Sequence, residues 1–491
     1  MEKYLCLGIF LACYAGFVFF PVRRSWCACA GALLLVLLGV MYPGQAFWSI
    51  NWNVMGVFTG AMIIAELLIF SRLPSVLAEH IVNRTKRASW AMLSLCGLTS
   101  FLSIFLENVA TVLIVAPIAL RITERLKIKP QMLLIALAVC SNLQGTGTLI
   151  GDSPSMILAG YAKMSFDDFF FYGGRPGIFF AVQAGALASL GVLYFFFRRV
   201  VRPREPVKVE RVRSWVPAGL LGGLVFSLAL ASFWRTDFPY KNGSICMTFG
   251  LVGLLLYKFK WKGGARDFIK GLDWDTGLFL MGVFVLVGGL SITGWIDVIT
   301  SLVEKASGEN LLRAYITIIG LSVIFSAFMD NIPYVMIMLP VVDRVAWDIH
   351  GPPALLIFGL LLGACLGGNI SPFGASANMV AVGMLRSRGI VVSVWEFAKM
   401  GLPFTMAAVT AGCLFLWLVW VGPRLSYSPG KVEKMTVEEL RPLTDYTKEE
   451  EKLGHIMDSM KETLRGLIEE LEDLIEREDE DTEPAREKTK D

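Results

Sequence analysis

Charged residues are scarce in this 491-residue chain. They make up 18% of the sequence, against 55% hydrophobic residues, whereas a water-soluble domain carries about 25% charged residues. Histidine occurs only three times, and the nine cysteines show no CxxC or Cys/His spacing, which argues against a zinc module or a disulfide-rich secreted domain. What the chain has instead is long apolar runs, so the sequence predicts an all-α polytopic membrane protein.

The charges that are present are unevenly divided. Residues 424–491 contain 21 of the 42 acidic residues, which leaves a basic hydrophobic body and an acidic tail. We interpret this pattern as excluding a nucleic-acid partner. The apolar N-terminus lacks a basic n-region and a clear cleavage site, so we expect a retained span.

Ten stretches are long and apolar enough to cross a bilayer. They lie near residues 4–21, 28–46, 52–70, 131–160, 177–197, 215–233, 245–259, 274–292, 353–383 and 397–421. Two further stretches, 88–120 and 313–342, are each broken by an acid–Asn pair, and we predict that both are re-entrant hairpins. With the N-terminus outside, the predicted inner loops hold 24 basic residues, Arg23 and Arg24 among them, and the outer loops hold eight, as the positive-inside rule requires.

The sequence repeats itself at an offset of 223 residues. LENVATVLIVAPI (106–118) matches MDNIPYVMIMLPV (329–341), and GTGTLIGDSPSMILAG (145–160) matches GNISPFGASANMVAVG (368–383). Each half contains five spans and one hairpin, an odd number of crossings, so the halves are predicted to be inverted. Inverted repeats with broken helices are typical of secondary transporters.

This pattern divides the chain into four parts. Residues 1–197 form the first repeat, 198–214 a basic inner linker, 215–421 the second repeat and 422–491 an acidic tail. Within the tail, apolar residues at heptad spacing over 453–474 favour a short coiled coil; an amphipathic or solvated helix is the alternative.

The acid–Asn pairs are the first candidate site. Glu107-Asn108 and Asp330-Asn331 stand in the middle of apolar runs, where a charge usually faces a polar cavity or a partner. We predict that each Asn caps the second half of its hairpin. Asn108 and Asn331 would ligate a dehydrated Na⁺ through oxygen, and Glu107 and Asp330 would take up and release protons.

Glycine-rich breaks in two spans are the second candidate site. Breaks at membrane depth are tolerated around a protein-lined or wet cavity. The polar and helix-breaking residues there are Gly145, Thr146, Gly147, Thr148, Gly151, Asp152, Ser153 and Pro154 in the first span, and Gly368, Asn369, Ser371, Pro372, Gly374, Ser376 and Asn378 in the second. Asp152 has Ala375 as its counterpart, so it is a candidate substrate or proton residue or an N-cap. Glu66, inside another span, is a secondary candidate, and a charge at a helix end is the alternative.

These motifs resemble the ion transporter superfamily, which includes citrate-type divalent-anion transporters, arsenite efflux permeases, NhaD-type sodium/proton antiporters and P-protein relatives. The resemblance covers roughly residues 28–421. It implies a homodimer in which a hairpin-bearing domain moves against a scaffold like an elevator. The family's Ser-Asn-Thr at the hairpin tips is replaced here by Glu107-Asn108-Val109 and Asp330-Asn331-Ile332, which is typical of the arsenite/NhaD/P-protein branch.

The sequence therefore predicts a secondary transporter of the plasma membrane that moves a small inorganic ion, by Na⁺/H⁺ exchange or arsenite-type efflux, and that has no cofactor. Sodium- or proton-coupled citrate transport is the alternative, ranked lower because neither broken span contains Arg or Lys. An intramembrane aspartyl protease using Asp152 and Asp330 would require a GxGD motif, which the LIGD sequence does not provide. A channel is the remaining class, and it would not need the repeated site.

Overall fold

The computed structural model describes residues 2–20, 23–85, 87–125, 127–200, 211–234, 238–261 and 265–422, with side chains from residue 268 onward in the last range. The predicted coiled coil at 453–474 lies outside these residues. The described chain is almost entirely helical, and its two-residue strands β1 (Phe171–Tyr172) and β2 (Arg175–Pro176) pair with each other. Eight of the described helices are long and apolar enough to cross a membrane. The chain is therefore an all-α multi-pass membrane protein.

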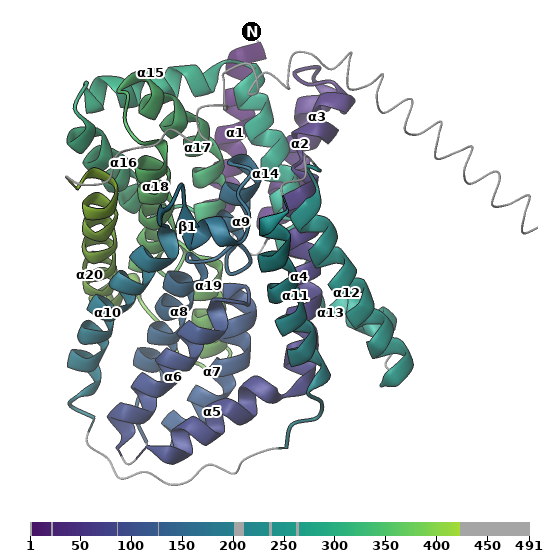
Figure 1. The fold of residues 1–491 in the computed structure, drawn as a ribbon, viewed down its shortest axis with the longest axis vertical. Helices are drawn as coiled ribbons and strands as arrows, with labels where there is room; N and C mark the ends of the chain where they lie inside the picture. Colours follow the sequence, from purple (N-terminus) through teal and green to yellow (C-terminus); the bar gives the residue numbers. More distant parts are fainter. Residues whose placement is uncertain are drawn as a thin grey trace, which may run out of the picture. The chain divides into compact units, whose positions relative to one another are not determined.

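The order of helices in the first half is repeated in the second (Figure 1). The first half contains α1 (Glu2–Phe19), α2 (Arg24–Leu37), α3 (Pro43–Ser49), α4 (Trp52–Ser71), α5 (Leu73–Arg84), α6 (Ala88–Ser103), α7 (Asn108–Arg125), α8 (Gln131–Gly145), α9 (Ser153–Tyr161) and α10 (Ile178–Phe197). The second contains α11 (Val216–Phe233), α12 (Lys241–Lys260), α13 (Ala265–Gly271), α14 (Trp274–Ile292), α15 (Trp295–Ser307), α16 (Leu311–Ser326), α17 (Asn331–Asp348), α18 (Pro353–Gly367), α19 (Ser376–Arg386) and α20 (Val394–Val421). The helices of the hairpins, α6 and α7, have the same lengths as α16 and α17.

Most helix boundaries lie close to the predicted ones, but the second apolar stretch is divided. The prediction of one span over 28–46 is wrong, because α2 ends at Leu37 and α3 begins at Pro43. Gly39 between them has a φ of 74°, a conformation that glycine adopts without strain. Pro43 then suits the first position of a helix.

The helices pack into two bundles, which we call the first and the second bundle. The first bundle consists of α1, α2, α4, α11, α12 and α14; the second consists of α6–α10 and α16–α20. In Figure 1 the first bundle lies mostly to the right and the second to the left. Cross-pairs between the halves recur in both bundles: α4 packs on α12 as α2 packs on α14, and α7 contacts α19 as α17 contacts α9. Helices α5 and α15 connect the bundles, and the hairpin tips lie where the bundles meet.

Candidate ion-binding site

The two hairpin tips have the same local geometry. In each, four residues separate the helices, and the last of the four is the acid. Glu107 Oε2 accepts a hydrogen bond from the Val109 N–H at 2.8 Å, and Asp330 Oδ1 accepts one from the Ile332 N–H at 3.1 Å. The prediction that asparagine caps these helices is therefore wrong. The carboxylate satisfies the unpaired N–H groups of the first turn, and the asparagine is the first helical residue.

The asparagines at the tips are buried, with exposures of 3% for Asn108 and 5% for Asn331. Asn108 Oδ1 accepts a hydrogen bond from Ser103 Oγ at 2.7 Å, and its backbone carbonyl accepts one from Ser141 Oγ at 3.1 Å. The first tip is thus tied to α8. Among the described residues there is no group of three or more His, Cys, Asp and Glu side chains that could hold a metal ion, so sodium ligation by these asparagines stays a prediction.

Each broken helix lies directly against the hairpin tip of its own half. A Cβ on Gly151 would come within 2.6 Å of the Gly145 carbonyl oxygen and 2.7 Å of that of Ser103; a Cβ on Gly374 would come within 2.6 Å of the Gly368 and Ser326 carbonyl oxygens. Only glycine permits so close an approach. Gly151 and Gly374 are therefore packing requirements of the two breaks. Pro154 and Pro372 lie buried within these two segments.

The polar residues of the first break do not all face one cavity. Thr146 Oγ1 donates to the Asn142 carbonyl at 2.8 Å, and the Thr148 hydroxyl donates to the Ile104 carbonyl. Gly147 lies close to the side chains of α10. The two hydroxyls therefore stabilise the unwound backbone and the hairpin turn, and Thr146 also lies beside the Cys365 thiol of α18.

Asp152 both caps a helix and leaves an oxygen unused. It is 4% exposed, and its Oδ1 accepts a hydrogen bond from the Ser153 N–H, the first residue of α9, at 2.9 Å. Its Oδ2 is buried without a hydrogen-bond partner in the described chain. The N-cap considered for this residue is therefore present, and its carboxylate lies beside the side chains of Asn108 and Cys365.

An amide network joins the breaks of the two halves. Asn142 Nδ2 donates to Asn369 Oδ1 at 2.7 Å and to Asn378 Oδ1 at 3.0 Å. Asn378 Nδ2 in turn donates to the carbonyls of Gly368 and Ser371 at 2.9 and 3.0 Å. Sequence reasoning missed Asn142, although an amide within the apolar run of α8 was a usable signal. The Ser371 hydroxyl accepts from the Gly374 N–H at 3.1 Å and so shapes the same break.

The Glu107 tip borders a small cavity between the bundles. Three carboxylates, those of Glu66, Glu107 and Asp273, line this space of about 80 Å³ together with apolar residues of α4, α7 and α9. None of the lining residues is basic, and Glu107 forms no ion pair in the described chain. The structure therefore places Glu66, the secondary candidate, beside a principal one.

The Asp330 tip is closed by an arginine. Arg24 Nη1 lies 2.5 Å from Asp330 Oδ2 and donates to Ser376 Oγ at 2.9 Å. The two charged side chains are 7% and 8% exposed. The prediction that Arg24 belongs to an inner loop is thus wrong, because it is buried in the first turn of α2. Citrate transport was ranked lower because neither broken span contains Arg or Lys. The Arg24 side chain nevertheless reaches the second break from α2, so that reason no longer applies.

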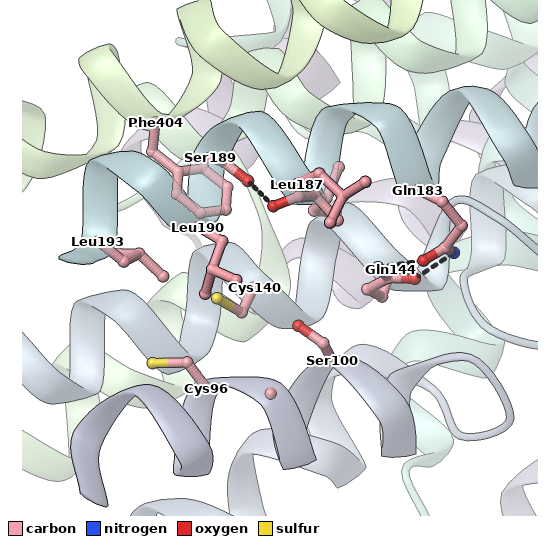
Figure 2. Close-up of a pocket in the computed structure, with 13 residues that line it drawn as sticks. Cys96, Ser100, Cys140, Gln144, Gln183, Leu187, Ser189, Leu190, Leu193 and Phe404 are labelled. Atoms are coloured by element: carbon pink, nitrogen blue, oxygen red, sulfur yellow. Dashed lines mark hydrogen bonds between the residues drawn. The ribbon is translucent and has the colours of Figure 1, made fainter. Parts of the chain in front are cut away.

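Another cavity, of about 160 Å³, lies among α6, α8, α10 and α20 (Figure 2). It is lined largely by apolar side chains and contains no carboxylate. Gln144 and Gln183 exchange two amide hydrogen bonds at its edge, at 2.9 and 3.2 Å. This cavity lacks the charged groups of the hairpin tips, and the amide pair joins α8 to α10.

Comparison with known proteins agrees with this architecture. The profile of the CitMHS family, described as Citrate transporter, matches residues 14–363 and 247–484. The chain belongs to this family. It is 30% identical to an uncharacterised transporter of Mycobacterium bovis over 84% of this chain and 98% of the relative. It is also 26% identical to the human P protein over 85% of this chain and 60% of that protein.

A solved structure shows the same fold. The YdaH transporter of Alcanivorax borkumensis superimposes with a TM-score of 0.53 over 79% of this chain and 88% of its own, at 14% sequence identity. Together with the family match, this establishes a membrane transporter of the citrate-transporter and ion-transporter type. The resemblance drawn from the hairpin and break motifs is confirmed.

Proposed function

We propose that this transporter exchanges a small cation, with Na⁺ as the first candidate, for protons by alternating access. The observation that carries this proposal is the cavity at Glu107, lined by three carboxylates and no basic residue. A buried carboxylate without an ion-pair partner favours its neutral form, and a bound cation favours the ionised form. One group can therefore bind either a proton or a cation, which is what coupled exchange requires.

The charges around the second tip support a cation over an anion. Arg24 faces Asp330 at 2.5 Å and Asp275 at 3.8 Å, so its positive charge is already compensated. Asp152 lies within electrostatic range of both Glu107 and Asp330. An anionic substrate would meet several carboxylates and one neutralised arginine. Arsenite-type efflux fits the same cavity less directly, because an uncharged substrate does not need the carboxylates.

Citrate-type transport is the second candidate, and Arg24 is the observation that favours it. If the Arg24 guanidinium left Asp330, it would offer two N–H donors to a substrate carboxylate. In this case the substrate would compete with Asp330, and transport would depend on Arg24 more than on Glu107.

We also propose that the transporter forms a homodimer and that its second bundle moves like an elevator. The two bundles meet at the hairpin tips, so a displacement of the second bundle against the first would carry both tips across the membrane. The family resemblance, rather than a contact within this chain, supports the dimer.

Flux in proteoliposomes tests the proposal. Full-length protein is reconstituted, an outward Na⁺ gradient is imposed, and the internal pH is followed with a trapped dye; labelled citrate uptake is measured in parallel. We expect Na⁺-dependent pH changes in the wild type and in Glu124→Gln, whose carboxylate is exposed, but not in Glu107→Gln. Full exchange by Glu107→Gln, or citrate uptake that needs Arg24 but not Glu107, would reject cation exchange.

A further inference from the structure

Arg24 reaches across the boundary between the bundles. Its helix, α2, packs on α14 in the first bundle, while Asp330 and Ser376 belong to the second. The guanidinium also donates to Thr276 Oγ1 at 3.2 Å and lies 4.7 Å from the ring centre of Phe279. It is therefore held by α14 while it binds the tip of the second hairpin.

The first tip has no such residue. At the offset that relates α4 to α14, Arg24 corresponds to Cys246 of α12. Glu107 forms no ion pair in the described chain and borders the cavity, whereas the equivalent carboxylate of Asp330 is capped by a cation. The two carboxylates use one oxygen alike, as helix caps, and differ in what meets the other oxygen.

The surroundings of Asp330 offer a ligand more than the arginine uses. The Tyr14 hydroxyl of α1, which lies within electrostatic range of Asp330, is buried without a hydrogen-bond partner in the described chain. The Ser376 hydroxyl and the Asp330 carboxylate supply further oxygens. Carboxylate and hydroxyl oxygens are ligands that a hard cation accepts.

We propose that Arg24 is a tethered competitor for the Asp330 carboxylate. Its guanidinium takes the place of an external cation at the second tip, so that cation binding there and the contact between α2 and the second hairpin exclude each other. This inference rests on the proposed cation exchange. It assigns to Arg24 control over how many cations bind and whether the bundles are joined at this tip.

A hydrogen-bonded path extends this role to the first tip. Thr276 accepts from Arg24 and donates to Asp273 Oδ2 at 2.7 Å, and Asp273 lines the Glu107 cavity. The path Asp330–Arg24–Thr276–Asp273 therefore connects the two carboxylate sites through the first bundle. A cation that binds Asp273 in this cavity would therefore change the hydrogen bonds of Thr276, which also holds Arg24.

Binding measured by thermal unfolding tests the competition. Purified full-length protein is titrated with NaCl against choline chloride at constant ionic strength. We expect Arg24→Met to be less stable than the wild type without Na⁺ and to need about tenfold less Na⁺ for half of its thermal shift, because the vacated carboxylate binds it. Arg24→Met/Asp330→Asn should lose this gain. Arg23→Met, which changes the exposed neighbouring cation, should match the wild type.

Arg24→Lys provides the second variant should Arg24→Met not fold. Lysine keeps the charge but cannot bind as a planar fork, so we expect a smaller gain in Na⁺ response in the same direction. Wild-type Na⁺ responses in both Arg24 variants would overturn the competitor role. Because binding is measured here and flux above, a wild type that exchanges no cation rejects the proposed function separately.

Discussion

The two hairpin tips share a backbone and differ in their electrostatic partners. Glu107 and Asp330 each cap the helix that follows them, through hydrogen bonds of 2.8 and 3.1 Å. Beyond this cap, Glu107 faces a cavity with two further acids, while Asp330 faces a buried arginine. A duplicated motif thus supplies the position of a carboxylate, and residues outside the motif decide whether that carboxylate is available.

The largest expected effect is a difference in stability between variants of the two tip carboxylates. Asp330→Asn removes the buried partner of Arg24 and leaves it only the half-exposed Asp275 at 3.8 Å, and breaking a buried pair costs about 3–5 kcal/mol. Glu107→Gln breaks no ion pair of the described chain and keeps an oxygen that can cap α7, so it should change stability little. Thermal unfolding of both variants checks this; equal destabilisation would mean that the two carboxylates have the same environment.

For ion flux we expect the opposite order, with the larger effect at the Glu107 tip. Loss of the unpaired Glu107 carboxylate should lower Na⁺-dependent exchange by about 100-fold, within the range of coupling between two bound ligands. Glu66→Gln, in the same cavity, should lower it only a few-fold because Glu107 and Asp273 remain. Exchange rates in proteoliposomes distinguish the two, and a larger loss for Glu66→Gln would move the main site to α4.

The third prediction tests whether both breaks need close backbone approach. Gly151→Ala and Gly374→Ala each place a Cβ within 2.6 Å of backbone oxygen, and overpacking of this kind costs about 1–3 kcal/mol. Gly383→Ala, with nothing within 4 Å of the added Cβ, is the matched control. Unfolding temperatures that fall for one glycine only would show that the breaks are not equivalent.

The fourth prediction addresses the link between the tips. Thr276→Val removes the hydroxyl between Arg24 and Asp273, at a cost of about 1 kcal/mol for each hydrogen bond. We expect a few-fold loss of exchange, with Thr248→Val in α12 as the control because that hydroxyl is exposed and bonds only within its helix. Unchanged exchange in Thr276→Val would show that the tips act independently.

The smallest effect on stability is expected from an ion pair on the surface. Arg344 and Asp297 form an ion pair whose side chains are 56% and 66% exposed, and exposed pairs contribute about 0–1 kcal/mol. Arg344→Met should therefore shift the unfolding temperature far less than Asp330→Asn. A comparable shift would mean that burial does not set the strength of these pairs.

The sequence predicted the helices and the interruptions because both are local patterns. Apolar runs indicate spans, and an acid–Asn pair within such a run marks the turn of a hairpin. The partners of the acids were not predictable in this way. Arg24 stands at a helix start beside Arg23, where a basic residue usually indicates a loop, and only the packing of α2 on α14 brings it to Asp330.

The same reason explains the errors at single residues. Asparagine and aspartate are both favoured helix caps, so the pair Asp330-Asn331 alone did not show which of its members caps the helix. At the first tip Glu107, a less usual cap, takes this place. The bridge from Asn142 to Asn369 and Asn378 joins positions more than 220 residues apart. A contact of this kind depends on how the two halves dock, which the pattern within one half does not contain.

The Asn142 bridge also bears on ancestry. The residue equivalent to Asn142 in the second half is Cys365, so the amide that joins the halves has no mate in the reverse direction. A gene duplication begins with two interchangeable copies. Here the copies have diverged until one contributes the amide donor and the other the two amide acceptors, whose equivalents in the first half are Thr146 and Ser155.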